Sequence, residues 1–148
     1  MKKTSALGVF LFTVFAFIPC YAHHLAVVVA KENKAESITS ANLSKMLKAE
    51  TKKWPDGKNV LIVLQRHSHA QSVTLERLNK MSAAALKAFL DSHPDSVQFA
   101  DTDVEILKIV ESLPGAIGLV DVRSIDDKVK VLKVDGKLPL EEGYLPHD

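Results

Sequence analysis

The 148-residue sequence is poor in cysteine, aromatic residues and glycine. It contains a single cysteine, Cys20, only 6% aromatic residues and six glycines. A single cysteine excludes an internal disulfide framework, so the hydrophobic core must hold the fold together. The G-x-S-x-G nucleophile, the G-K-[ST] phosphate loop and the H-E-x-x-H metal motif are also missing. The sequence therefore predicts neither an enzyme nor a bound cofactor.

The chain also lacks an excess of either charge. Nineteen Lys and Arg residues oppose 18 Asp and Glu residues, and the two signs are interspersed along the sequence. A protein that binds nucleic acid or anionic lipid without specificity normally carries a basic patch or run. We therefore expect no nucleic-acid partner.

A short apolar run near the start predicts export. Lys2 and Lys3 precede apolar residues from 6 to 18, and the segment ends at the small residue Ala22. This is the pattern of a secretory signal peptide, and the run is shorter than the roughly 20 residues of a membrane span. We expect cleavage after Ala22, so that residues 23–148 form one periplasmic domain without membrane insertion.

Cys20 raises a second possibility for the amino terminus, which is lipid modification of its thiol. The residues before it, Phe17, Ile18 and Pro19, do not include the small residue that lipoprotein processing requires. Cleavage after Ala22 would remove Cys20 together with Lys2 and Lys3, and it would leave 17 basic residues against 18 acidic ones.

The remaining sequence alternates strand-length apolar runs with helical patterns, which predicts an α/β fold. A short helix containing Leu43, Met46 and Leu47 is expected after hydroxyl residues that can cap it. The other expected elements are strands at 25–30, 60–64, 116–120 and 129–134, and helices at 70–80, 83–90 and 102–113.

Four local signals support these boundaries. Thr102 and Glu105 form a T-x-x-E capping box, and Gly115 is expected as the residue that ends that helix. Gly118 is expected where two elements pack closely. Trp54 adjoins a Pro-Asp-Gly turn and is expected to pack over the first helix.

Two stretches carry a family resemblance. Residues 43–66 read L-S-K-M-L-K-A-E-T-K-K-W-P-D-G-K-N-V-L-I-V-L-Q-R, and residues 114–121 read P-G-A-I-G-L-V-D. They resemble one lobe of the type II periplasmic binding proteins, in the branch of phosphate ABC transporter substrate-binding proteins. The resemblance covers roughly residues 25–144. It implies a single α/β lobe with a central mixed β-sheet flanked by helices, and solute capture as the function.

The resemblance also implies a half-site. In that family the chain returns to a second lobe near the segment that corresponds to E-G-Y-L-P, residues 142–146 here. Two-lobed binding proteins enclose their ligand between the lobes. A second lobe, a homodimer or another partner would therefore have to complete the cleft, and an ABC permease is the implied transport partner.

The family places its ligand loop after the second strand, which corresponds to residues 66–74, R-H-S-H-A-Q-S-V-T. Helix N-termini there can bind an oxyanion through unpaired N–H groups and a partial positive charge. The candidate ligand-binding residues are Arg66, Ser68, Gln71, Ser72 and Thr74. His67 and His69 stand where family members use glycine. The alternative is a polar connection in which Ser68 or Ser72 merely caps a helix.

Four histidines form weak metal candidates, which are His23, His24, His67 and His69. His67 and His69 would face the same side of an extended segment, and a new amino terminus at His23 would add a nitrogen ligand. Exposed histidines without a ligand are the alternative, and we expect no metal.

Two functions follow from these observations. The first is weak binding of phosphate or another small oxyanion, or binding that requires a partner to complete the cleft. The second is an exported, non-enzymatic interaction module that has lost ligand binding and docks an envelope partner. A polar concavity around Arg66 and Ser68 would favour the first, and an exposed apolar patch would favour the second.

Overall fold

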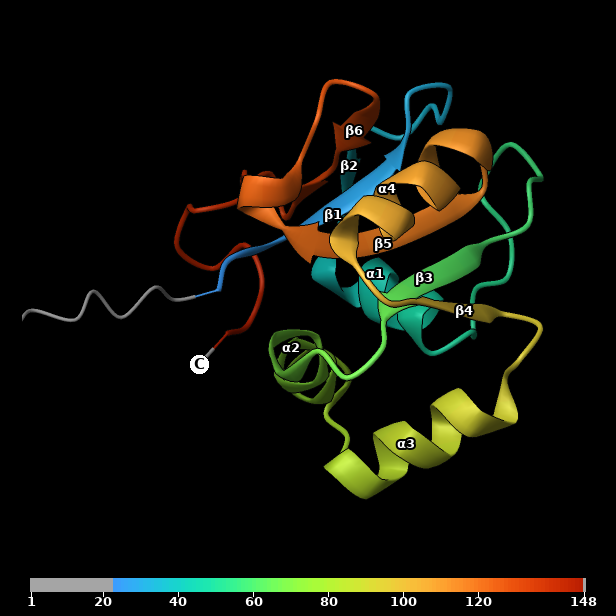
Figure 1. Ribbon diagram of the computed structural model, residues 1–148, viewed down its shortest axis with the longest axis vertical. Helices are drawn as coiled ribbons and strands as arrows, with labels where there is room; N and C mark the ends of the chain where they lie inside the picture. Colours follow the sequence, from blue (N-terminus) through green and yellow to red (C-terminus); the bar gives the residue numbers. More distant parts are fainter. Residues whose placement is uncertain (1–22, 148) are drawn as a thin grey trace, which may run out of the picture.

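A five-stranded mixed sheet with helices on both faces forms the centre of the protein (Figure 1). The computed structural model describes residues 23–147, so the predicted signal peptide and Cys20 lie outside the described residues. The strands are β1 (Leu25–Ala30), β2 (Ser37–Ile38), β3 (Leu61–Gln65), β4 (Val97–Ala100), β5 (Ala116–Asp121), β6 (Val129–Val131) and β7 (Lys133–Val134). The helices are α1 (Ser40–Leu47), α2 (His69–Asn79), α3 (Ala83–Ser92) and α4 (Asp103–Ser112), with a 3-10 turn at Val122–Ser124.

The main sheet has the strand order β4-β3-β5-β1-β6. Strand β3 runs parallel to β4 and β5, while β1 runs antiparallel to β5 and β6. The carboxyl ends of β3, β4 and β5 therefore meet at one edge of the sheet, and the start of β1 lies at the same edge because Leu25 pairs with Asp121. This confirms the α/β class and the mixed sheet.

Each face of the sheet has its own core, because successive residues of a strand point to opposite faces. All six residues of β1 are buried, as expected for a continuous apolar strand covered on both sides. Val28 packs with Ile106 and Val110 of α4 on one face. Val27 and Val29 pack on the other face in the cluster that includes Leu43 of α1. In Figure 1, α4 lies in front of the sheet and α1 behind it.

Side-chain caps fix where the helices begin. Thr39, Ser68, Ser82 and Thr102 each accept a hydrogen bond from a backbone N–H in the first turn of the following helix. The half of the capping box that involves Thr102 is confirmed. The carboxylate of Glu105 accepts instead from the backbone N–H of Asp101, at 2.8 Å.

One sequence expectation about strands was wrong, and two short strands were missed. Residues 129–134 form two short strands in different sheets, because Leu132 turns inward between them and its N–H donates to the carbonyl of Val27. Strand β4 was missed, since it is only four residues long and Gln98 in it is exposed. Strand β2 was missed because two residues are too few to show a pattern.

Gly115 is required for a reason other than the expected one. Helix α4 ends at Ser112 with Leu113 as its C-cap, and Gly115 is not among the residues with positive φ. A Cβ on Gly115 would lie 2.0 Å from the carbonyl oxygen of Asn59. The carbonyl of Gly115 also accepts from the indole N–H of Trp54, at 2.9 Å, and Trp54 is buried as expected. Gly118 does mark close packing, because a Cβ there would lie 2.8 Å from Ile106.

Candidate functional site

A cavity of about 700 Å³ lies at the edge where the parallel strands end. Gln65 at the end of β3 and Asp121 at the end of β5 line it, together with the first residues of α2 and α4. Ligand sites in α/β sheets characteristically lie beyond the carboxyl ends of the strands. This cavity is therefore the candidate functional site.

The amino terminus of α2 forms one wall. Ser68, His69 and Ala70 line the cavity. The Ser68 hydroxyl caps the helix by accepting from the N–H of Gln71, at 3.3 Å. Helix α2 carries no acidic residue in its first turn, so its partial positive charge is not offset locally. This wall suits a negatively charged group.

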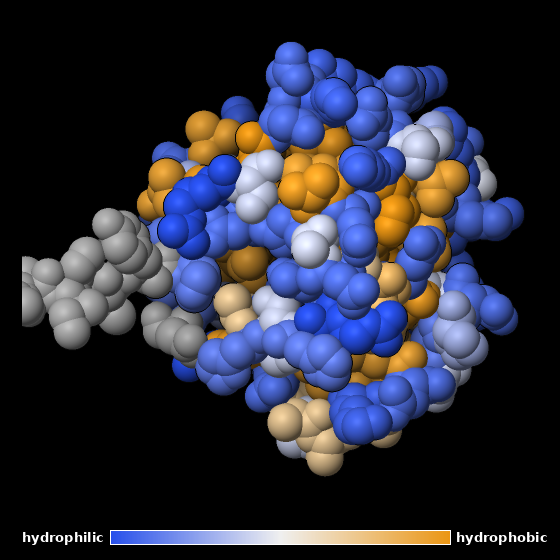
Figure 2. Space-filling view, in the orientation of Figure 1, coloured by the Kyte–Doolittle hydropathy of each residue, from blue (hydrophilic) through white to orange (hydrophobic). Residues whose placement is uncertain are grey.

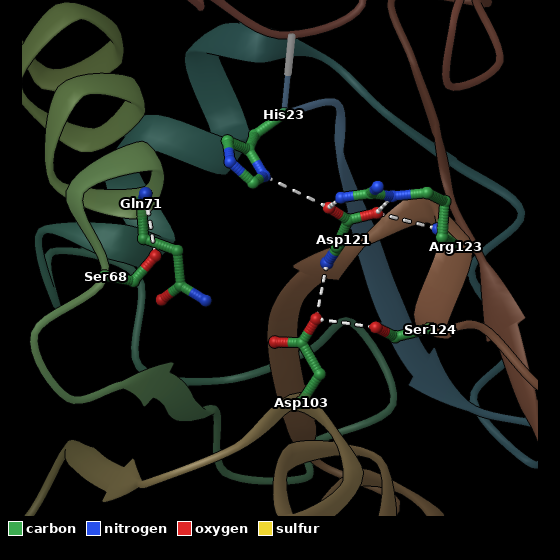
Figure 3. A network of polar contacts seen from close by, with 7 residues as sticks. All are labelled: His23, Ser68, Gln71, Asp103, Asp121, Arg123 and Ser124. Carbon is green, nitrogen blue, oxygen red and sulfur yellow. Dashed lines mark hydrogen bonds and ion pairs between the residues drawn. The ribbon is translucent and has the colours of Figure 1, made fainter. Parts of the chain in front are cut away.

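Asp103 and Asp121 form the opposite wall (Figure 3). One oxygen of Asp103, Oδ2, accepts from the backbone N–H of Asp121 and from the hydroxyl of Ser124, both at 2.9 Å. The other oxygen, Oδ1, is buried and has no hydrogen-bond partner among the described residues.

Asp121 is held by basic side chains. The Arg123 guanidinium donates from Nε to Oδ1 at 2.9 Å and from its terminal nitrogen to Oδ2 at 2.7 Å. His23 lies on the other side, with Nδ1 3.3 Å from Oδ2. The hydrogen bonds from the Arg123 side chain, with smaller contributions from its backbone and from His23, hold the pKa of Asp121 well below its usual range.

Arg66 lies outside this cavity. Its Nε is 3.2 Å from Oδ1 of Asp101, and its guanidinium carbon lies 5.5 Å from the centroid of the Phe99 ring. Both charged side chains are exposed, at 53% for Arg66 and 74% for Asp101. The Arg66 guanidinium, which was predicted to bind the oxyanion, therefore lies against residues of and after strand β4. Gln65, the residue before it, lines the cavity.

The other predicted ligand residues have internal hydrogen bonds. Gln71 is buried, accepts from the N–H of Gln65 and donates to the carbonyl of Leu119. Ser72 donates to the carbonyl of Ser68. Thr74 is buried and donates to the carbonyl of Pro146, at 2.8 Å. Of the five predicted ligand residues, only Ser68 lines the cavity.

The four histidines are dispersed. His67 has a left-handed backbone with φ of 61°, and His69 is the first residue of α2. The expectation that they lie on one extended segment was therefore wrong. His23 and His69 line the large cavity, whereas His24 stacks edge-on against His147 beside a second cavity of about 230 Å³. Within residues 23–147, no three His, Cys, Asp or Glu side chains are grouped so as to hold a metal ion.

Sequence reasoning missed Asp103, Asp121 and Arg123 as site residues. Asp121 is the last residue of β5, and Asp103 is the first residue of α4, after the cap residue Thr102. Both elements were expected from the sequence. The missing information was the strand order, which places the end of β5 beside the end of β3. A polar residue at the carboxyl end of each parallel strand is the signal that could have identified them.

Comparison with known proteins identifies the fold. No family model and no curated protein matches the sequence. Among solved structures, similarity extends to an ABC-type phosphate transport receptor from Vibrio cholerae (19% identity, TM-score 0.65, 78% of this chain and 48% of that one). A phosphate ABC transporter substrate-binding protein with bound phosphate from Clostridium perfringens matches equally well (19%, 0.65, 78% and 46%). PstS from Borrelia burgdorferi is also similar (20%, 0.63, 78% and 49%).

These similarities confirm the fold expected from the sequence. The chain has the α/β architecture of phosphate substrate-binding proteins, and it spans about half the length of the solved structures that it matches. The matched proteins are transport receptors. Within residues 23–147, no helix is long and apolar enough to cross a membrane.

Proposed function

We propose that this protein is an exported, non-enzymatic solute-binding protein whose cavity takes a small oxyanion such as phosphate. The observation that carries the proposal is the amino terminus of α2, which opens on the cavity with Ser68 at its cap and no acidic residue in its first turn. Unpaired N–H groups and the helix dipole favour an anion at such a position. Solved proteins of this fold include one with bound phosphate.

The proposed site lies within a single lobe, between the amino terminus of α2 and the wall formed by Asp103 and Asp121. A cavity within one lobe offers fewer contacts than a cleft that closes around its ligand, so binding is expected to be weak for the isolated domain. A second lobe, a second copy or an ABC permease would complete the cleft. Light scattering with and without phosphate tests the second copy directly.

Docking through an apolar surface has less support from the structure. The large apolar side chains that are exposed among the described residues are Val104, Leu113, Leu138 and Leu140. They fall in two separate segments of the chain, α4 with its C-cap and residues 138–140. On the face shown in Figure 2, apolar and polar side chains are interspersed. A binding surface normally presents a contiguous apolar patch.

The test replaces Ser68 with aspartate. Aspartate is as good a helix cap as serine, so Ser68→Asp keeps α2 while its carboxylate occupies the anion position. Ser82→Asp is the matched control, because Ser82 caps α3 in the same way, with its hydroxyl accepting from the N–H of Ala85 at 3.1 Å.

Phosphate at tens of millimolar should raise the melting temperature of residues 23–148 and of Ser82→Asp, but not of Ser68→Asp. Equal phosphate responses in the two variants, or no response in the unmodified protein, would contradict the proposal.

A further inference from the structure

We propose that the preferred ligand is a zwitterion, a small oxyanion that also carries an ammonium group. The inference rests on the proposed function and narrows the ligand class for the same cavity. It starts from Asp103, whose Oδ2 accepts two hydrogen bonds while its buried Oδ1 accepts none among the described residues. A buried carboxylate oxygen without a donor is unfavourable, so a ligand that supplies a donor gains affinity there.

The position of Asp103 relates this oxygen to the cavity. Asp103 lines the cavity, and in Figure 3 its unpaired oxygen points toward the space that separates it from Ser68 and Gln71. The helix-terminus donors and the carboxylate acceptor thus lie on opposite sides of the same space.

The two walls of the cavity also differ in charge, and the wall that contains Asp103 is the more negative one. The first turn of α4 contains Asp103 and Glu105, whereas the first turn of α2 contains no acidic residue. Arg123 is hydrogen-bonded to both oxygens of Asp121, so these two side chains together contribute little net charge. The amino terminus of α4 adds a partial positive charge of about half a unit to its own wall, but the full negative charge of Asp103 exceeds it. This wall is therefore negative, while the wall formed by α2 is positive.

A fully deprotonated oxyanion, which has no donor of its own, matches only one of these walls. It would be attracted by the N-terminus of α2 and repelled by Asp103 across the cavity. A ligand with an oxyanion at one end and an ammonium group at the other satisfies both walls at once. The volume of about 700 Å³ leaves room for both groups.

The test compares methylphosphonate with aminomethylphosphonate, which differ by one amino group, by amide chemical-shift titration of residues 23–148. One additional charge-assisted hydrogen bond should make aminomethylphosphonate bind about tenfold more tightly. Inorganic phosphate serves as the reference anion.

Asp103→Asn is the decisive variant. The asparagine oxygen can keep the bonds from the N–H of Asp121 and the hydroxyl of Ser124, while its NH₂ group replaces Oδ1, so an acceptor becomes a donor. The preference for the amino compound should disappear, and deprotonated methylphosphonate should bind more tightly than it does to the native protein. Asp56→Asn is the matched control, since it removes the same charge from an exposed turn that precedes β3.

The outcomes separate this inference from the proposed function. Equal binding of the two phosphonates by the native protein, or a preference that Asp103→Asn retains, would overturn the zwitterion proposal while leaving oxyanion binding intact. Binding of none of the three compounds at tens of millimolar would overturn both. If Asp103→Asn does not fold, the ratio of the two affinities for the native protein still decides the question.

Discussion

The side-chain amide of Gln71 donates to the carbonyl of Leu119 at 2.8 Å, and this bond ties the first turn of α2 to strand β5. The amide oxygen of Gln71 accepts from the N–H of Gln65 at the end of β3. One buried side chain therefore fixes the helix terminus against two strands that end at the cavity. Gln71 therefore holds the start of α2 in place beside the proposed site, and it does not itself line the cavity.

Replacing Gln71 with leucine should destabilise the protein by about 2–4 kcal/mol, because the buried N–H of Gln65 and the carbonyl of Leu119 both lose their partner. Urea unfolding followed by circular dichroism measures the change. Gln98→Leu is the control, since Gln98 is exposed on strand β4, and its effect should stay within about 0.5 kcal/mol. Similar values for the two variants would show that the Gln71 bonds contribute little.

Local sequence patterns were sufficient to predict the helices and strands that surround the site. They were insufficient to predict which side chains line it. The buried strands β1, β3 and β5 follow from apolar runs, and α4 follows from its cap at Thr102. The partners of Arg66 and Gln71 depend on tertiary contacts: Asp101 lies 35 residues from Arg66, and Leu119 lies 48 residues from Gln71. No periodicity within one segment contains that information, so two donor side chains were assigned to a ligand although they have protein partners.

Arg66 provides a test of whether the oxyanion fork predicted from the sequence can take part in binding. Asp101→Ala removes the carboxylate that holds the guanidinium, so phosphate affinity should rise by about three- to tenfold. Stability should change by less than about 1 kcal/mol because the ion pair is exposed. Calorimetric titration measures the affinity. An identical gain in the double variant that also carries Arg66→Ala would show that Arg66 does not contact the anion.

Gly115 and Gly118 should differ in their tolerance of a methyl group. A Cβ at Gly115 would meet the backbone oxygen of Asn59 at 2.0 Å, whereas at Gly118 the nearest atom is a side-chain methyl of Ile106 at 2.8 Å. A side chain can shift more easily than backbone, so Gly118→Ala should cost about 1–3 kcal/mol and Gly115→Ala more. Chemical denaturation gives both values, and the reverse order would refute the close-approach explanation for Gly115.

Tyr144 should make the stability depend on alkaline pH. Its hydroxyl donates to the carbonyl of Leu132 at 2.7 Å and accepts from the N–H of Val27 at 3.1 Å. Burial raises the pKa of Tyr144 from 10.0 to about 12, against a smaller opposing effect of the bond from Val27. The contribution is fully present below pH 10 and is lost as the pH rises to 12, because the unfolded state releases the proton first. The total loss should be about 2–3 kcal/mol.

Absorbance at 295 nm can follow this ionisation in residues 23–148, since the other tyrosine, Tyr21, precedes the expected cleavage site. Tyr144→Phe should be less stable at neutral pH, and its free energy of unfolding should lack the Tyr144 contribution between pH 10 and 12. A tyrosine midpoint near pH 10 in the folded protein would contradict the buried, hydrogen-bonded environment.

The most direct test of the proposed function is a map of amide chemical shifts of ¹⁵N-labelled residues 23–148 during titration with phosphate. If the cavity binds the anion at the amino terminus of α2, the largest changes should occur at Ser68, His69 and Ala70, with smaller changes at Thr102 and Asp103. Changes confined to another face of the protein, or none at tens of millimolar phosphate, would contradict oxyanion binding at this cavity.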